Sequence, residues 1–333
     1  MALTFTEKAA AEMQERVDKL INIGYTEMQI STFHAFCQKL LEDYGLDIGL
    51  PNRFRLLTET EAWLIVRENL FARFDLDYYR PLGNPGKYID EMIDHFGKCK
   101  DELISPEEYL EYAESVKLDS DDVHTDEPSR LIEIANAYHA YQQLLLDNAS
   151  LDFADLIYYS HKLLTDRPAI RAAFQRQYKY ILIDEFQDVN YAQYELVKLL
   201  TMSNEHGTRN NSQLTVVGDD DQSIYAFRGA SVANILRFKE DYPEAREIVL
   251  TENYRSAQEI LDRAYECIQR NNPDRLEAKL NINKRLTSII PVADPDCTSP
   301  RAPSPRRRGD FVNHLHHKTG EDEVRAVIDE IKN

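Results

Sequence analysis

Residues 180–185 read Tyr-Ile-Leu-Ile-Asp-Glu, so four residues of an apolar run lead directly into two carboxylates. A short apolar run of this kind is typical of a strand buried in a parallel sheet. An aspartate at the carboxyl end of such a strand can hold Mg²⁺, and a neighbouring glutamate can polarise a water molecule for attack on a phosphoryl group. Asp184 and Glu185 therefore predict a nucleotide-hydrolysing site, with capping of the following helix as the alternative role for the two acids.

A second apolar run further along the chain ends in the same way. Residues 214–217, Leu-Thr-Val-Val, lead into Gly-Asp-Asp-Asp-Gln at 218–222, and Ser-Ile-Tyr-Ala-Phe-Arg-Gly-Ala follows at 223–230. This second strand ending strengthens the catalytic interpretation of the first. The pattern predicts a polar sensor, Gln222, beside an aromatic platform.

Strand and helix signals alternate on both sides of these runs. A short strand at 4–6 leads into an amphipathic helix, a strand at 29–32 leads into another helix, and a further strand is predicted at 247–250. This alternation predicts an α/β fold with a parallel sheet.

Helical signals dominate from about Leu46 to Ser150. Residues 105–108, Ser-Pro-Glu-Glu, are a strong helix start, and Thr-Glu-Thr-Glu at 58–61 is a weaker copy. Apolar residues then recur at helical spacing after Pro128. We interpret this stretch as a helical insertion into the α/β domain.

Composition indicates a globular protein. The 333 residues are 43% hydrophobic, which is enough for roughly two or three domains with their own cores. No apolar stretch approaches the roughly 20 residues of a membrane span, and the first residues lack the features of a signal peptide. We therefore expect a cytoplasmic protein with no membrane contact. The four cysteines form no CxxC pair, which argues against a disulfide framework or a zinc ribbon.

The formal net charge of −19 argues by itself against a nucleic-acid partner. Much of the acid, however, lies between residues 101 and 127, and such runs are mostly solvated loops or helix faces. The excess need not touch any DNA channel.

Six motifs carry a family resemblance. In chain order they lie at 3–10 (Leu-Thr-Phe-Thr-Glu-Lys-Ala-Ala), 31–34 (Ser-Thr-Phe-His), 151–156 (Leu-Asp-Phe-Ala-Asp-Leu), 184–188 (Asp-Glu-Phe-Gln-Asp), 218–230 and 252–256 (Glu-Asn-Tyr-Arg-Ser). Together they resemble the ordered motifs of superfamily 1 DNA helicases of the UvrD/Rep/PcrA type.

The resemblance implies a RecA-like P-loop NTPase motor domain, called 1A, formed by residues 1–45 and 150–245. An all-helical insertion, 1B, would occupy 46–149. Residues 246–333 would begin a second RecA-like domain, 2A, and the Pro/Arg-rich stretch at 291–308, which is unlike the family, reads as a linker.

The resemblance also implies a role for individual residues, with ATP and Mg²⁺ as cofactors. Asp184 would coordinate Mg²⁺ and Glu185 would be the catalytic base. The remaining nucleotide contacts would come from the γ-phosphate sensors Gln222 and Arg255, from Tyr254 stacked on adenine, and from Arg228 near the phosphates.

Single-stranded DNA would follow a path lined by aromatic rings. The resemblance assigns this path to Phe5, His34, Tyr225 and Phe227, with Thr4 and Thr32 near the DNA backbone. Stacking suits such a role because every base has a π-face and stacking tolerates any sequence. Each ring taken alone could equally be a core aromatic.

The chain also departs from the family. No segment matches G-x-x-x-x-G-K-[ST], and the nearest candidate, residues 83–88, has the wrong spacing and no hydroxyl. We expect this phosphate loop upstream of Leu3 and the later motor motifs, including an arginine finger, beyond the end of the chain. A chain truncated at both ends would be inactive alone. His-Leu-His-His at 314–317 has no supporting ligand spacing for a metal.

The resemblance therefore implies part of an ATP-dependent DNA helicase or translocase acting in repair, replication or recombination, and the 3′ to 5′ direction comes from the resemblance only. Its partners would be single-stranded DNA, single-strand/duplex junctions, and repair or recombination proteins. Two alternatives remain open: a non-catalytic fragment that binds single-stranded DNA or another protein, and the motor part of a recombination helicase-nuclease.

Overall fold

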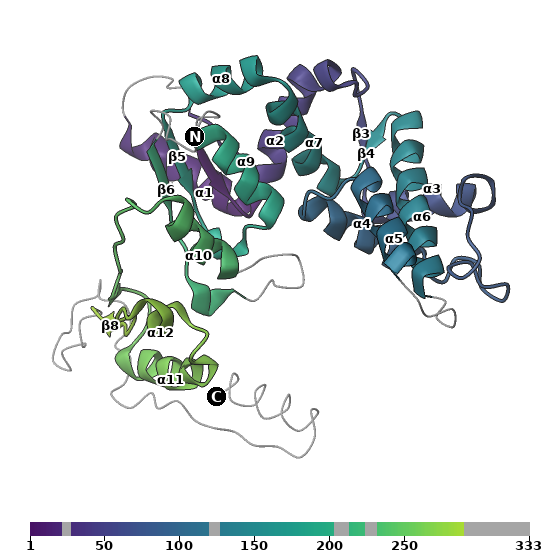
Figure 1. Cartoon of the computed structure of the whole chain (residues 1–333). Coiled ribbons are helices and arrows are strands. Elements are labelled where there is room, and N and C mark those ends of the chain that lie inside the picture. The colour runs from purple at the N-terminus through teal and green to yellow at the C-terminus, as the bar shows by residue number, and fades with distance from the viewer. Residues whose placement is uncertain (22–27, 120–126, 203–212, 224–231, 290–333) are drawn as a thin grey trace, which may run out of the picture. The chain divides into compact units, whose positions relative to one another are not determined.

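The computed structural model describes residues 1–21, 28–119, 127–202, 213–223 and 232–289 (Figure 1). The chain divides into two compact units, residues 1–243 and 244–333, and each is described by itself. None of the described helices is both long and apolar enough to cross a membrane.

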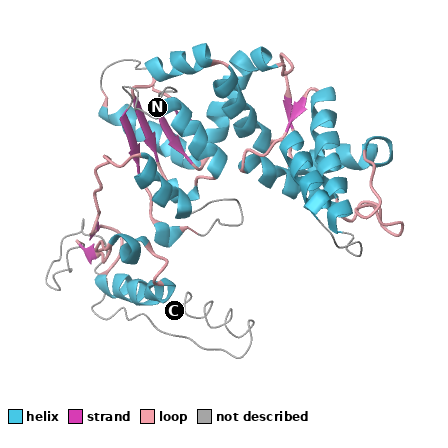
Figure 2. Cartoon of the chain, in the orientation of Figure 1, coloured by secondary structure: helices cyan, strands magenta, loops and turns pink. Residues whose placement is uncertain are grey.

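A four-stranded parallel sheet forms the centre of the first unit (Figure 2). Its strand order is β2-β1-β5-β6, from β1 (Ala2–Thr4), β2 (Ile30–Thr32), β5 (Tyr180–Ile183) and β6 (Gln213–Val216). Leu3 pairs with Ser31 on one side and with Ile183 on the other. The α/β class with a parallel sheet is therefore confirmed, and the strand predicted at 4–6 lies two residues earlier because Thr6 caps the next helix.

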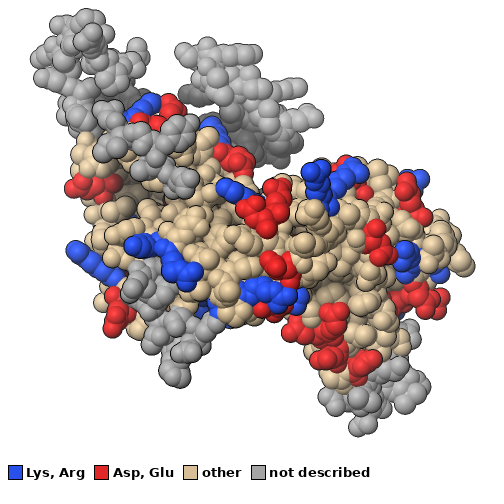
Figure 3. Space-filling view, turned by 90° about the horizontal axis from the view of Figure 1, so that it is seen from above, with Lys and Arg blue, Asp and Glu red and all other residues tan. Residues whose placement is uncertain are grey.

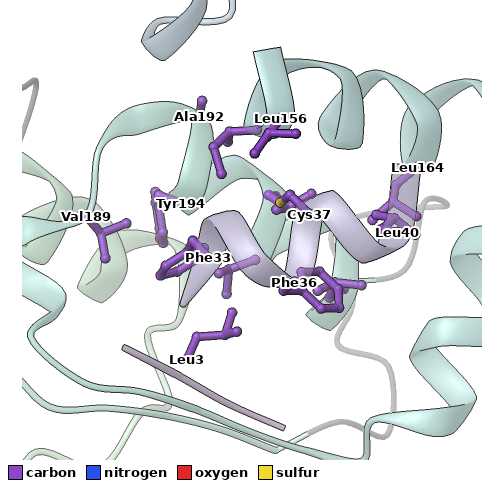
Figure 4. Close-up of a cluster of buried hydrophobic side chains, with 14 of the residues drawn as sticks. Leu3, Phe33, Phe36, Cys37, Leu40, Leu156, Leu164, Val189, Ala192 and Tyr194 are labelled. Carbon is purple, nitrogen blue, oxygen red and sulfur yellow. The ribbon is translucent and has the colours of Figure 1, made fainter. Parts of the chain in front are cut away.

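Helix α7 (Phe153–Asp166) packs against both α2 (Phe33–Tyr44) and α9 (Tyr191–Thr201), and the three helices share a buried cluster with residues of the sheet. Figure 4 shows side chains of these helices, among them Phe33, Leu156 and Tyr194, converging with Leu3 of β1 in the buried cluster. The unit also contains α1 (Glu7–Leu20), α8 (Pro168–Gln177) and α10 (Val232–Asp241).

Strand β5 is buried on one face only. Ile181 and Ile183 are buried in the core, whereas Tyr180 and Leu182 are 62% and 48% exposed. The prediction of a fully buried strand was therefore wrong. Successive side chains of a strand point to opposite faces, and no described helix closes over the second pair.

Four longer helices form the segment between the two parts of the sheet domain. They are α3 (Glu59–Arg73), α4 (Ile89–Asp101), α5 (Pro106–Asp119) and α6 (Glu127–Asp147). The chain enters and leaves this segment through β3 (Arg55–Leu56) and β4 (Ser150–Leu151), which pair in parallel. A short 3₁₀ turn, η1 (Gly45–Ile48), follows α2.

Both helix starts predicted in this segment are confirmed. The Thr58 hydroxyl accepts from the Glu61 amide and the Glu61 carboxylate accepts from the Thr58 amide, which is a capping box. Ser105 and Glu108 exchange the same two hydrogen bonds at the start of α5. These reciprocal bonds satisfy amides that the first turn of a helix otherwise leaves unpaired.

The second unit contains a two-stranded parallel sheet of β7 (Glu252–Asn253) and β8 (Thr287–Ser288). Helix α11 (Gln258–Ile268), a 3₁₀ turn η5 (Gln269–Asn271) and α12 (Leu276–Leu280) lie between the two strands in sequence. The strand predicted at 247–250 was wrong, because these residues form no strand and Ile248 and Leu250 are exposed. The linker at 291–308 and the histidines at 314–317 lie outside the described residues.

Candidate functional site

The two carboxylates after β5 occupy a sharp turn. The Asp184 amide continues the sheet by donating to the Leu3 carbonyl at 2.9 Å. Glu185 then adopts the left-handed conformation, with φ 52° and ψ 45°, before the 3₁₀ turn η2 (Phe186–Asp188). The turn buries Phe186 and leaves the Glu185 side chain exposed. A non-glycine residue in this conformation is strained, and such strain is concentrated at functional sites.

Gln187 joins the ends of the neighbouring strands β5 and β6. Its side-chain amide donates to Glu185 Oε2 at 2.6 Å, and its Oε1 accepts from the Asp219 amide at 2.9 Å. The Gln187 side chain is buried, and both bonds are partly buried. Gln187 therefore orients the Glu185 carboxylate and holds it to the end of β6.

Gly218 allows this close approach. A Cβ on Gly218 would lie 2.9 Å from Gln187 Oε1 and 3.3 Å from the Gln187 amide nitrogen. Any larger residue at 218 would push the two strand ends apart. These contacts bring the segments 184–188 and 218–222 together.

Three further carboxylates follow at the end of β6: Asp219 caps the turn η3 (Asp220–Gln222), and Asp220 and Asp221 lie in it. Ligand oxygens of Asp219, Asp220 and Asp221 lie within 4.8 Å of one another, a spacing that a divalent cation could use. Asp219 accepts from the Asp221 amide and from the Gln222 side-chain amide, the latter at 2.8 Å. Gln222, the predicted sensor, is exposed and held by this bond.

Asp188 has a polar atom without a protein partner. Its Oδ1 is buried and makes no hydrogen bond among the described residues. Burial raises the pKa of Asp188, and the nearby Glu185 carboxylate raises it further. Asp184, Glu185 and Asp188 thus offer oxygen ligands of the kind Mg²⁺ prefers, and an orphaned oxygen suits a site that a ligand or its water completes.

The carboxyl ends of β1 and β2 carry the threonines predicted to lie near DNA. Thr4 and Thr32 are paired in register, and both are buried. The Thr32 hydroxyl donates to Glu7 at 2.7 Å and accepts from the Ala35 amide, so it caps α2. The Thr4 hydroxyl has no hydrogen-bond partner among the described residues.

His34 faces an aromatic ring that was not predicted as a site residue. The ring of Phe153 meets His34 edge to face, with 6.0 Å between centroids, and Phe153 is 48% exposed. Burial lowers the pKa of His34, although Glu7 opposes the shift, so the imidazole is neutral near pH 7. Phe153 lies within the motif at 151–156, and its position directly after a helix cap is the feature of the sequence that could have identified it as a site residue. Phe5, the other predicted ring among the described residues of this unit, is half-buried.

The remaining predicted residues lie elsewhere. Tyr254 is 71% exposed and donates from its hydroxyl to Glu252, at 2.6 Å, in the second unit. The exposed Arg255 follows it in a turn fixed by Asn253, whose side chain accepts from the Arg255 amide. Tyr225, Phe227 and Arg228 lie outside the described residues.

Charge on the surface does not by itself mark a binding path. Figure 3 shows Lys and Arg interspersed with Asp and Glu over the described part of the face that it draws. Because charges of both signs are mixed on this face, aromatic contacts rather than charge indicate the candidate DNA path.

Comparison with known proteins identifies the family. Residues 1–243 match the family model of the UvrD/REP helicase N-terminal domain. The chain belongs to the UvrD/REP helicase family. The resemblance seen in the six motifs is thereby confirmed.

Curated relatives in this family share more than a third of their matched residues with the chain. The ATP-dependent DNA helicase PcrA of Bacillus subtilis is 39% identical over 273 residues, covering 82% of this chain and 33% of the relative. The PcrA of Leuconostoc citreum is 36% identical over 282 residues, covering 84% and 34%. A probable DNA helicase II homolog of Mycoplasma capricolum is 38% identical over 273 residues, covering 81% and 34%. The chain spans about a third of the length of these relatives.

Proposed function

We propose that this chain supplies the metal-binding and catalytic carboxylates, and part of the single-stranded DNA path, of an ATP-dependent DNA helicase. The observation that carries the proposal is the joint made by Gln187 between Glu185 at the end of β5 and Asp219 at the end of β6. In a nucleotide-hydrolysing motor, this joint would keep the base and the sensor segment at a fixed separation.

The domain boundaries form part of the proposal. Residues 1–45 and 150–245 would be the RecA-like motor domain 1A, and 46–149 the helical insertion 1B. Residues 246–333 would begin the second motor domain 2A.

In the nucleotide site, Asp184 would hold Mg²⁺, which neutralises phosphate charge when bound. Glu185, oriented by Gln187, would accept the proton of the attacking water. Gln222 would sense the γ-phosphate from the end of β6. Arg228, and Tyr254 and Arg255 from the second unit, would complete the contacts to ATP.

On the DNA side, Phe5, His34 and Phe153 would offer ring surfaces to successive bases, together with Tyr225 and Phe227. An exposed ring held by a neighbour is suited to stacking because it is ordered before the base arrives. Thr4 and Thr32 would lie near the strand. Movement would run 3′ to 5′ toward a single-strand/duplex junction, in a cytoplasmic repair, replication or recombination role with protein partners from those processes.

A second candidate function is binding of single-stranded DNA without hydrolysis. The observation in its favour is that the 333 residues contain no G-x-x-x-x-G-K-[ST] loop to cradle phosphates. We expect the isolated chain to hydrolyse ATP at background, and turnover stimulated by single-stranded DNA in a clean preparation would reject this expectation.

The DNA path is tested by Phe153→Ala in the chain of residues 1–333, with a labelled oligo-dT and fluorescence anisotropy. Loss of one stacking ring should weaken binding roughly fivefold to a hundredfold. Phe71→Ala is the matched control, because Phe71 is 73% exposed on α3 and has no proposed DNA role. Equal affinities for both variants and the wild type would show that Phe153 is not on the path. The absence of any oligo-dT binding by the wild type would reject the proposed function for this chain.

A further inference from the structure

The last turn of α4 contains a buried lysine that pairs with two carboxylates. Lys100 Nζ lies 2.6 Å from Asp152 Oδ2 and 2.8 Å from Asp155 Oδ1, and its side chain is fully buried. The Tyr141 hydroxyl donates to the same Asp152 oxygen at 2.9 Å, and Lys100 Nζ lies 5.0 Å from the centre of the Tyr141 ring. Burial opposes the charge of Lys100, but Asp152 and Asp155 outweigh it and keep its pKa raised.

The carboxylates that Lys100 binds form the cap of α7. Asp152 is the N-cap residue, and it exchanges hydrogen bonds with the backbone and side chain of Asp155 in a capping box. Without a cation these two carboxylates would repel each other inside the protein. Lys100 therefore fixes the geometry of the first turn of α7 from a different helix.

The next residue of α4 makes a second attachment. Asp101 Oδ1 accepts from the side-chain amide of Asn190 at 2.8 Å, and Asn190 is the N-cap of α9. Two consecutive residues of α4 thus hold the caps of two helices that pack on the sheet. Two points of attachment prevent α4 from pivoting about either one, so the position of Lys100 is itself fixed.

Phe153 directly follows the cap that Lys100 holds. It is the first residue of α7, and its ring meets His34. A shift of the cap would therefore move this ring, since no residue separates Asp152 from Phe153. The Lys100 side chain itself is too deeply buried to touch a DNA strand.

We propose that Lys100 is a positioning residue for single-stranded DNA binding, which acts by fixing the capping box of α7 and thereby the ring of Phe153 against His34. The inference rests on the proposed DNA path and adds a residue to it from the helical segment between β3 and β4. A purely structural role would change the stability of the protein and leave the position of the ring in folded molecules unchanged.

The position of the ring can be read without DNA from the NMR signal of the His34 imidazole. In the chain of residues 1–333, Phe153→Leu removes the ring, and the resulting change in the His34 ring-proton chemical shift measures the full effect of the Phe153 ring. Lys100→Met should move the His34 signal by a substantial part of that amount. Lys98→Met is the matched control, because Lys98 is exposed on the same helix and its substitution removes the same charge. A folded Lys100→Met protein with an unmoved His34 signal would overturn the proposal.

Buried unpaired carboxylates can prevent the Lys100→Met variant from folding. The variant Lys100→Met/Asp152→Asn/Asp155→Asn removes that obstacle, because asparagine also caps helices and carries no charge. It should show the same movement of the His34 signal, and a signal at the wild-type position would overturn the proposal equally.

Oligo-dT affinity provides the second reading, in a double-mutant cycle. Lys100→Met should weaken binding about fivefold in the wild type, the lower end of the effect of one stacking ring, and have almost no effect in the Phe153→Ala background. Equal losses in both backgrounds would show that Lys100 does not act through Phe153. If the wild type binds no oligo-dT, the proposed function fails, and the His34 signal still decides whether Lys100 positions the ring.

Discussion

Buried polar groups are paired with one another at the junction of α4 with α7, whereas at the edge of the sheet formed by the ends of β5 and β6 one of them lacks a partner among the described residues. At the junction, Lys100, Asp152 and Asp155 satisfy one another within hydrogen-bonding distance. At the edge, Asp188 Oδ1 is buried without a partner among the described residues. A buried polar atom without a partner costs about 1 to 3 kcal/mol.

Charged groups thus have two different roles within the first unit. The paired groups at the junction fix the relative position of helices. The incompletely bonded Asp188 at the edge lowers stability, which is the usual pattern of a site completed by a ligand. The junction should therefore respond to mutation mainly in stability and ring position, and the edge mainly in activity.

The largest expected effect is on hydrolysis at the edge. Hydrolysis requires a phosphate loop, so the measurement uses a chimera in which this chain replaces the matched segment of the Bacillus subtilis PcrA. Glu185→Gln keeps the size of the side chain and removes the base, so ATP hydrolysis should fall about 10² to 10⁴-fold while ATP binding survives. A mutant within about threefold of the parent chimera would reject Glu185 as the base.

The next effect is on stability at the junction. Lys100→Met leaves two buried carboxylates without their cation, and breaking a buried pair typically costs about 3 to 5 kcal/mol of unfolding free energy. Urea denaturation of the chain of residues 1–333 measures the loss, with Lys98→Met as the control expected to change little. A loss below about 1 kcal/mol would show that water reaches the pair and that the junction is not dry.

Gly218→Ala tests the contact between the two strand ends. The added methyl would meet Gln187 Oε1 at 2.9 Å, and overpacking of this kind typically costs about 1 to 3 kcal/mol. Gly97→Ala is the opposite case. Gly97 lies in the interior of α4, and no atom of the described residues outside its own helix backbone lies within 4 Å of its Cβ position, so alanine should stabilise by about 0.5 to 1 kcal/mol. Thermal melting of both variants should give shifts of opposite sign, and a neutral Gly218→Ala would contradict the close approach.

The smallest effect is a pH dependence at the junction. Burial, with help from Asp152 and Glu102, raises the pKa of Asp101 to about 7 from an ordinary 3.8. Between these values the folded chain keeps a proton that the unfolded chain has released, so the contribution of Asp101 to stability falls as pH rises through this window. Above it the contribution is constant.

Asp101→Asn removes this titration and keeps an oxygen for the Asn190 amide. Between pH 5 and pH 7 the wild type should lose on the order of 1 to 2 kcal/mol relative to the variant, by urea denaturation at each pH. The titration of Asp155, also raised to about 6, is present in both proteins and largely cancels in the difference. Parallel stability profiles for the two proteins would show that Asp101 is charged throughout this range.

The sequence predicted the parallel sheet, the polar residues that follow β5 and β6, and the capping boxes of α3 and α5, because each depends on a local pattern. It did not predict the exposed face of β5, since an apolar run does not reveal whether a helix covers both sides of a sheet. Gln187 and Lys100 were also missed as connecting residues. Their partners lie 32 and 52 positions away along the chain, and only the fold brings them together.

The central claim is that the edge of the sheet and the His34–Phe153 pair belong to one DNA-dependent motor. The most direct measurement is ATP hydrolysis by the chimera with and without oligo-dT. The account predicts that single-stranded DNA stimulates hydrolysis. Phe153→Ala should raise the oligo-dT concentration needed for this stimulation roughly fivefold or more, and Phe71→Ala should leave it unchanged. A folded chimera that binds both ATP and oligo-dT, yet hydrolyses ATP at the same rate with and without DNA, would contradict it.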